Sequence, residues 1–232
     1  MIKVHSASSL FILTVIGLWP VGSGIPPSHA QSACRHFGSS PNVTLRIEPG
    51  KIVLSNGFSR SQIKTLSSRR PLSSGLGSRW QPIGLTLTEH QFSMQVEVRA
   101  RRIARNRFCG QLSRVDARLG YDKLKVYIAR KYRPGSCNYR SILDHENRHV
   151  AVFRGTLVKY APRIERRLER LAASLGPVLA GSADQAAKIL QKKLQRQLEP
   201  LFREMDRETD FRNAKLDTPQ NYQKEQRRCS QW

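Results

Sequence analysis

The chain has 232 residues and a formal net charge of +23 at neutral pH, with 40 lysines and arginines against 17 aspartates and glutamates. This length suits one domain with a hydrophobic core and is awkward for two. Such a charge would favour nucleic acid as the partner of a cytosolic protein. An exported chain would instead meet anionic lipid, cell-wall polymers or acidic partners.

The first thirty residues predict a secretory signal peptide. Residues 10–21 are apolar, but they are too few and too interrupted by Gly and Pro to span a bilayer. A small-x-Ala pattern ends at Ala30, so we expect cleavage there. We therefore expect a periplasmic or secreted protein whose mature chain, residues 31–232, is a single domain without a membrane span.

Residues 42–132 alternate apolar or β-branched residues with polar ones, which predicts strands separated by Gly, Pro, Ser and Asn. We expect a mostly antiparallel sheet in this half. Residues 59–68 favour a short helix, and residues 67–78 are typical of a loop. Residues 31–137 are thus expected to be mainly β.

From Asn138 onward the period changes to that of a helix, so residues 138–232 are expected to be mainly α. The first helix should pass through Pro162 with a kink and break at residues 175–177. Ser182 opens a second amphipathic helix with a capping-box pattern, and the tail after Asp210 is expected to be irregular. The sequence therefore predicts an α+β fold with the sheet packed on the first helix.

The cysteines are even in number, and an exported protein is expected to pair them as two disulfides. The preferred pairing joins Cys109 to Cys137 and Cys34 to Cys229. The other two connectivities remain open.

Two runs are rich in arginine. Residues 163–170 repeat at helical spacing, which favours a solvated helix face. Residues 99–107 are as consistent with a binding patch for anionic cell-envelope surfaces as with an ordinary solvated surface.

A candidate zinc site lies in residues 142–153, "ILDHENRHVAVF". His145 and His149 are four residues apart and project from the same face of a helix, so both can bind one zinc ion. Glu146 points elsewhere, but it can act as the general base for a water that zinc activates. The alternative is a charged helix turn that matches HExxH by chance, about one time in a hundred for this composition.

The third ligand is less clear. Val152 and Gly155 exclude the extended metzincin motif. We prefer Asp217 in the tail, although it suits an ordinary cap or turn equally well. Glu169 has the spacing of thermolysin-like enzymes, but an unbroken helix would carry it about 30 Å past His149.

Four further residues or segments complete the expectations. His36 and His90 are remaining candidates for the third ligand. Tyr222 is a candidate for oxyanion stabilisation if the tail reaches the metal. Residues 124–132 could pair with an extended substrate, or they could be an ordinary strand of the sheet.

The ordered set Cys109, Cys137, His145, Glu146 and His149 resembles a family of secreted bacterial proteins described as predicted zinc-dependent proteases. The resemblance covers most of the mature chain. It implies an α+β zincin-like domain with both histidines on zinc and the glutamate as base. Members of that family carry an Asp, Thr and His cluster in the tail, and Phe211 stands where the His would fall.

These patterns together predict an exported zinc metallopeptidase that acts on peptides or proteins. Two alternatives are a basic cell-envelope binding protein with a vestigial HExxH, and a zinc amidase of cell-wall material.

Overall fold

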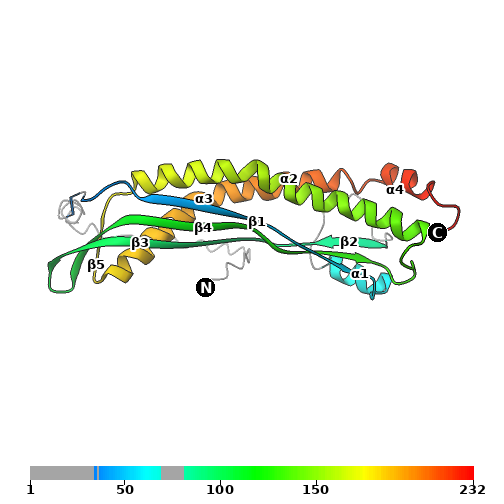
Figure 1. Ribbon diagram of the computed structural model, residues 1–232, viewed down its shortest axis with the longest axis horizontal. Helices are drawn as coiled ribbons and strands as arrows, with labels where there is room; N and C mark the ends of the chain where they lie inside the picture. The colour runs from blue at the N-terminus through cyan, green and yellow to red at the C-terminus, as the bar shows by residue number, and fades with distance from the viewer. Residues whose placement is uncertain (1–33, 36, 69–80) are drawn as a thin grey trace, which may run out of the picture.

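Figure 1 shows the fold in a computed structural model, which describes residues 34–35, 37–68 and 81–232. In chain order the elements are β1 (Asn42–Ser55), α1 (Arg60–Ser68), β2 (Gly84–Leu87), β3 (His90–Ala104), β4 (Arg107–Ile128), α2 (Cys137–Ser174), β5 (Val178–Ala180), α3 (Ala183–Ala214) and α4 (Pro219–Gln226). The predicted α+β class is confirmed. The signal peptide, His36 and most of the loop expected at residues 67–78 lie outside the described residues.

Strand β4 is the centre of the sheet. Tyr127 pairs with Ser55 of β1 on one side and with Leu85 of β2 on the other. At the opposite end of β4, Cys109 pairs with Arg101 of β3 on one side and with Leu179 of β5 on the other. The pairs of β4 with β2, β3 and β5 are antiparallel, whereas β1 runs parallel to β4. The expectation of a mostly antiparallel sheet is therefore confirmed, and the one parallel pair makes the sheet mixed, because alternation reveals a strand but not its direction.

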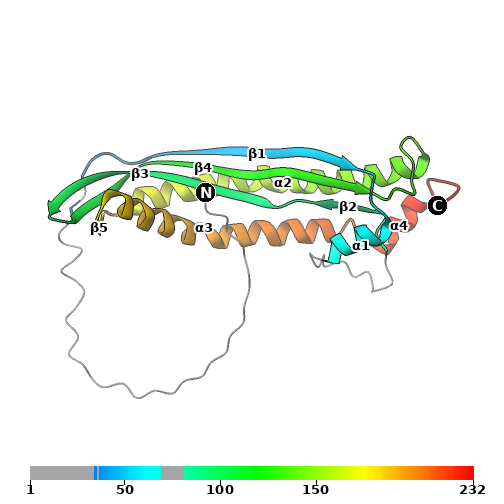
Figure 2. The same ribbon diagram turned by 90° about the horizontal axis from the view of Figure 1, so that it is seen from below.

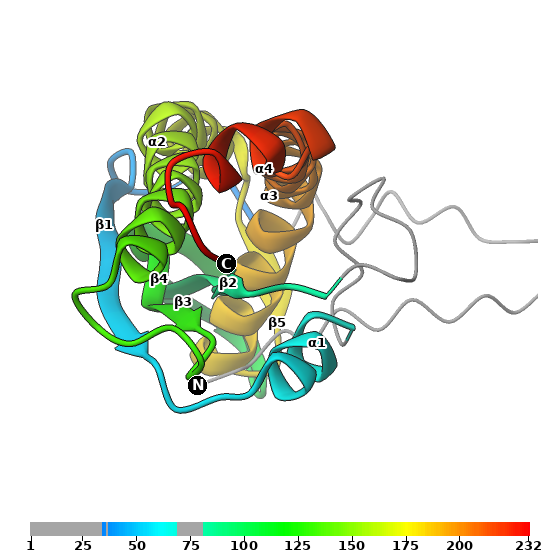
Figure 3. The ribbon, with the colours of Figure 1, turned by 90° about the vertical axis from the view of Figure 1, so that its right-hand side faces the viewer.

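Helices α2 and α3 lie side by side along one face of the sheet (Figures 2 and 3). The core between them contains Leu119 of β4, Leu157 of α2 and Leu190 of α3, all at most 1% exposed. Burial of each such leucine stabilises the fold by about 1.5–3 kcal/mol. This packing holds α2 rigidly against the sheet along its length.

The ends of the two long helices agree with their sequence signals. Helix α2 continues through Pro162 and ends at Ser174, directly before the predicted break. Ser182 is the N-cap of α3, and its hydroxyl accepts a hydrogen bond from the backbone N–H of Gln185. Residues 60–68 form α1, within the range expected for a short helix.

The tail corrects one expectation, because it is not irregular throughout. It contains the short helix α4, whose N-cap is Thr218 and whose first residue is Pro219. Thr followed by Pro is a favourable helix start. A helix of only 8 residues is too short for hydrophobic periodicity to reveal it.

The disulfides join Cys34 to Cys109 and Cys137 to Cys229, so the preferred pairing was wrong. That pairing needed a chain reversal between Cys109 and Cys137. Instead β4 continues from Cys109 to Ile128 without a turn, which separates the two ends by about 60 Å at 3.3 Å per residue. Disulfide formation requires α-carbons within about 7 Å.

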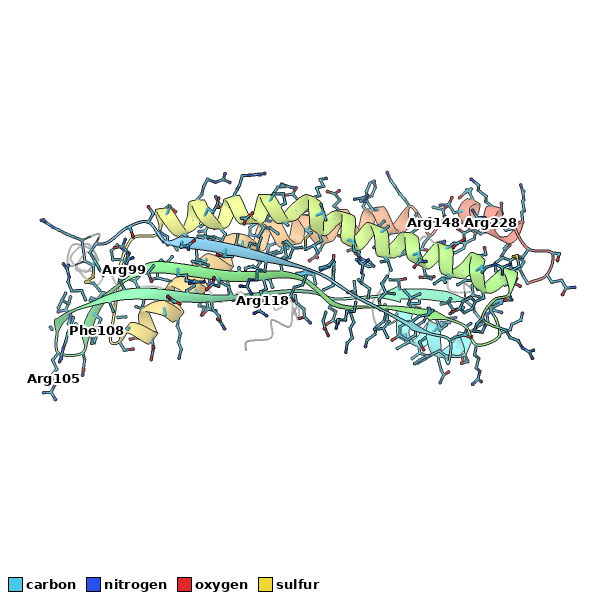
Figure 4. All side chains as sticks on the ribbon, viewed as in Figure 1. Arg99, Arg105, Phe108, Arg118, Arg148 and Arg228 are labelled. Carbon is cyan, nitrogen blue, oxygen red and sulfur yellow. A yellow bond between two sulfur atoms is a disulfide. The ribbon has the colours of Figure 1, made fainter. Side chains whose placement is uncertain are left out.

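The two arginine-rich runs lie in different elements of the fold. Residues 99–107 form the hairpin between β3 and β4, and Figure 4 shows Arg99 and Arg105 at the end of the molecule opposite Arg148 and Arg228. Residues 163–170 belong to α2, where Arg163 forms an ion pair with Glu204 of α3. No helix in the described ranges has the length and apolar character needed to cross a membrane.

Candidate metal centre

The HExxH residues lie near the beginning of α2. Ser136 caps this helix, its hydroxyl accepting a hydrogen bond from the N–H of Tyr139. His145, Glu146 and His149 are only 4–6% exposed, because α2 packs against β2 on one side and the tail on the other. The motif is therefore a buried group and not a solvated helix turn.

Three ligand atoms converge at this point. Nε2 of His145 lies 3.0 Å from Nε2 of His149, and Oδ1 of Asp217 lies 3.2 and 3.3 Å from these two nitrogens. Tetrahedral zinc with bonds of about 2.0–2.1 Å places its ligands about 3.3 Å apart. The triangle of two nitrogens and one oxygen therefore matches three positions of a zinc coordination sphere.

The outer nitrogens of both imidazoles have partners of their own. Nδ1 of His145 lies 3.0 Å from Oε1 of Glu225, and Nδ1 of His149 lies 2.9 Å from Oδ1 of Asn213. Since both partner atoms are oxygen acceptors, each Nδ1 must carry the hydrogen, and each Nε2 then presents a lone pair. Two lone pairs and a carboxylate oxygen that face one another require a cation, as in metal sites whose histidines donate to outer acceptors.

Charges around the cluster show what happens when no metal is bound. Burial by itself lowers the pKa of His145, but hydrogen bonds to Asp217 and Glu225 and the charge of Glu146 outweigh it and raise the pKa to about 10. Burial opposes the charged form of Asp217, yet contacts with both histidines hold its pKa well below the usual range. A proton therefore takes the place of the cation in the metal-free protein.

This exchange predicts opposite pH dependences for the two forms. The free energy of unfolding of the metal-free protein should fall as pH rises from 6.5 to about 10, because the folded state keeps a proton on His145 that the unfolded state loses. Stabilisation by added zinc should grow over the same range, since zinc competes with that proton. Urea unfolding with EDTA and with zinc measures both trends, and metal-free stability that increases across this range would contradict the prediction.

Glu146 stands beside the triad without belonging to it. Its Oε2 accepts a hydrogen bond of 2.7 Å from the hydroxyl of Thr86 on β2. Burial raises its pKa, as expected for a carboxyl group in a site with little water. Glu146 and His145 also line the same cavity, of about 420 Å³. A substrate in this cavity would thus meet the carboxylate and the metal ligand together.

Strand β2 approaches Glu146 so closely that residue 84 has no room for a side chain. A Cβ on Gly84 would lie 2.3 Å from Oε1 of Glu146 and 2.7 Å from Cγ2 of Ile142. We expect Gly84→Ala to lower the free energy of unfolding by about 1–3 kcal/mol through overpacking. Gly57→Ala is the matched control, because no heavy atom lies within 4 Å of its Cβ. Equal urea-denaturation midpoints for the two variants would rule out this close packing.

The edge beside the site belongs to a different strand from the one expected. Residues 125–127 pair with β1 and with β2 at once, so they are central in the sheet and closed to a substrate. Strand β2 pairs only with β4 within the described part of the chain, and it lies against α2 through Thr86. The candidate edge for an extended peptide is therefore β2. The sequence could not show this, because strand order depends on long-range pairing.

Tyr222 reaches two of the candidate metal ligands, His145 and Asp217, from α4. Its hydroxyl donates to Oδ1 of Asp217, and its ring stacks on His145 with centroids 5.2 Å apart. Burial, together with the charge of Asp217, raises its pKa, so the hydroxyl stays protonated as a donor. Tyr222 also lines the cavity next to His145.

The other candidates for the third ligand lie elsewhere. Glu169 is exposed on the same unbroken helix, twenty residues after His149. Nδ1 of His90 lies 2.9 Å from Oδ1 of Asp206, and His90 is not part of the triad. Phe211, where the resembling family has a His, is 60% exposed and does not belong to the buried group.

Sequence reasoning missed Asn213, Glu225 and Thr86, which hold the two histidines and the glutamate in place. Asn213 left a signal, since Met205, Thr209 and Asn213 recur every four residues along the buried face of α3. Glu225 left none, because its position depends on the fold of the tail.

No protein-family model, curated protein or solved structure matches this chain. The family resemblance therefore stays a prediction. The structure itself provides the buried group of His145, His149 and Asp217 on and against a long helix.

Proposed function

We propose that this protein is an exported zinc-dependent metallopeptidase. The observation that carries the proposal is the convergence of Nε2 of His145, Nε2 of His149 and Oδ1 of Asp217, with both Nδ1 atoms already hydrogen-bonded to oxygen. Two nitrogen donors and one carboxylate form a common ligand set of catalytic zinc sites, which keep a fourth position open. Two disulfides support export, because they persist in oxidising compartments.

A zinc ion, when bound, supplies the Lewis acidity that makes water a nucleophile near neutral pH and polarises a carbonyl group. Glu146 is then the general base, which takes the proton from the attacking water and passes it to the leaving amine. Its raised pKa moves the carboxylate toward the range of an efficient base, and the hydroxyl of Thr86 fixes its orientation. We assign stabilisation of the oxyanion to Tyr222, whose hydroxyl would turn its one hydrogen from Asp217 to the substrate oxygen.

Substrate binding follows from the position of β2. A peptide that adds to the free edge of this strand gains backbone hydrogen bonds and crosses the cavity lined by Gly84, His145 and Glu146. The geometry therefore favours an extended peptide or protein segment as substrate.

The test uses protein produced from the full-length sequence in an exporting bacterial host, with both disulfides formed. Incubation with casein and with a mixed peptide library, followed by mass spectrometry, should reveal internal cleavage. A chelator should stop this cleavage, and zinc should restore it. Intact substrates in the presence of stoichiometric zinc would contradict the proposal.

A further inference from the structure

The cavity beside the candidate metal centre has a second wall that the proposed chemistry does not use. This wall contains Arg60 at the start of α1, Lys131 after β4 and Ser141 in the first turns of α2. All three line the same cavity of about 420 Å³ as His145 and Glu146. A bound substrate would therefore contact them at the same time as the catalytic group.

Two polar atoms in this wall lack a partner. Nε of Arg60 and Oγ of Ser141 are buried, and within the described part of the chain neither has a hydrogen bond. A helical serine usually satisfies its hydroxyl with the carbonyl four residues earlier, but Ser141 does not, although it is only 5% exposed. Buried polar groups are nearly always hydrogen-bonded, so two exceptions in one cavity point to a ligand.

The charge that remains in the cavity is positive. Both carboxylates in the cavity already have hydrogen-bond partners. Glu146 accepts a hydrogen bond from Thr86. Glu225 accepts one of 2.6 Å from Arg148 and also contacts His145. No described carboxylate lies within ion-pair distance of Arg60 or Lys131. The cavity can therefore accept one more negative group without opposing charge.

We propose that Arg60 and Ser141 form a subsite for a carboxylate of the substrate, with Lys131 at its rim. The guanidinium of Arg60 fits a carboxylate through two parallel hydrogen bonds, and the hydroxyl of Ser141 donates a third. Ser141 lies one helical turn before His145, so the bound carboxylate belongs to a residue next to the scissile bond. The substrate class is thus peptides with an acidic residue or a free carboxyl end at that position. This inference rests on the proposed peptidase function.

Binding is measured with the Glu146→Gln variant, so that no peptide is consumed. The probes are N-acetylated hexa-alanine peptides with one Glu or one Gln at each position in turn, each made with a C-terminal amide and with a free carboxyl end. Calorimetry should show the best Glu peptide binding about tenfold to a hundredfold more tightly than its Gln counterpart, as charged hydrogen bonds predict. If only the free carboxyl end matters, the subsite recognises a chain terminus instead of a side chain.

Substitutions in the wall decide whether these residues carry the preference. Arg60→Gln should remove it, so that Glu and Gln peptides bind with equal affinity, and Arg60→Lys should keep part of it. Ser141→Ala should weaken binding of the Glu peptide but leave the melting temperature equal or higher, because it removes an unpaired buried hydroxyl. A purely structural serine would instead lower the melting temperature.

The subsite would be overturned if neither a Glu side chain nor a free carboxyl end strengthened binding, or if the preference survived both Arg60→Gln and Ser141→Ala. Cleavage by the wild-type protein separates this outcome from failure of the proposed function. If the wild type cuts the peptides with and without the extra carboxylate at equal rates, the proposed peptidase function is supported and the subsite is contradicted. If it cuts neither while the Glu peptide still binds preferentially, the subsite stands and the peptidase falls.

Discussion

Replacing Glu146 by glutamine should abolish hydrolysis while zinc stays bound. The side chain keeps its size and can still pair with Thr86, but it can no longer accept a proton. Loss of a general base typically lowers kcat by about 10²- to 10⁴-fold. Because Glu146 is not one of the three converging ligand residues, the zinc content should not change. Peptide cleavage assays and elemental analysis of the same preparation measure both quantities.

Glu169→Gln is the matched control, because Glu169 is exposed on the same helix and its substitution removes the same charge. Its cleavage rate and zinc content should equal those of the wild type. If Glu146→Gln retained full activity, the assignment of the general base would be wrong. If it lost zinc, Glu146 would be a ligand and not the base.

Breaking the disulfide between Cys137 and Cys229 should weaken zinc binding by about tenfold to a hundredfold, the usual effect of losing an outer support of a metal site. This disulfide fastens the tail to the start of α2, and the tail supplies both Asp217 and Glu225 to the histidines. In the double Cys→Ser variant, those carboxylates must be ordered by weaker contacts. Competition with a fluorescent zinc chelator gives the dissociation constant.

The other disulfide provides the control. Cys34 and Cys109 lie on the first part of the chain and the start of β4, far along the sheet from the HExxH turn. Their double replacement by serine should lower the free energy of unfolding by about 2–5 kcal/mol, as removal of a native disulfide usually does. Zinc affinity of the folded protein should stay unchanged. Equal losses of affinity in both variants would show that the effect is general destabilisation.

The fold could be predicted where its signals are local. Helix boundaries near residues 174 and 182 and the capping of α3 by Ser182 follow from neighbouring residues. Strand β4 shows the limit, because its pattern suggests two separate strands around Asp122. From Val115 to Tyr121 the buried apolar side chains stand at odd-numbered positions, and from Leu124 to Ile128 they stand mainly at even-numbered ones. One long strand can therefore resemble two when its buried face switches.

The candidate site also has a part that follows from local sequence and a part that does not. His145, Glu146 and His149 form one turn of one helix, so their spacing alone places them together. Asp217 could be proposed from ligand chemistry. Its position beside the histidines, however, depends on α3, on the turn after it and on the disulfide between Cys137 and Cys229, which the sequence did not predict. The outer partners Asn213 and Glu225 come from segments more than sixty residues away. The periodicity of α3 indicates that Asn213 is buried, but no local pattern shows that either residue contacts a histidine.

Elemental analysis of the purified, disulfide-bonded protein tests the central claim most directly. Two imidazole lone pairs and a carboxylate aimed at one point should hold one zinc per chain, and His145→Ala or His149→Ala should each lose it. A wild-type protein that stays free of metal in excess zinc, with both disulfides formed, would contradict the account.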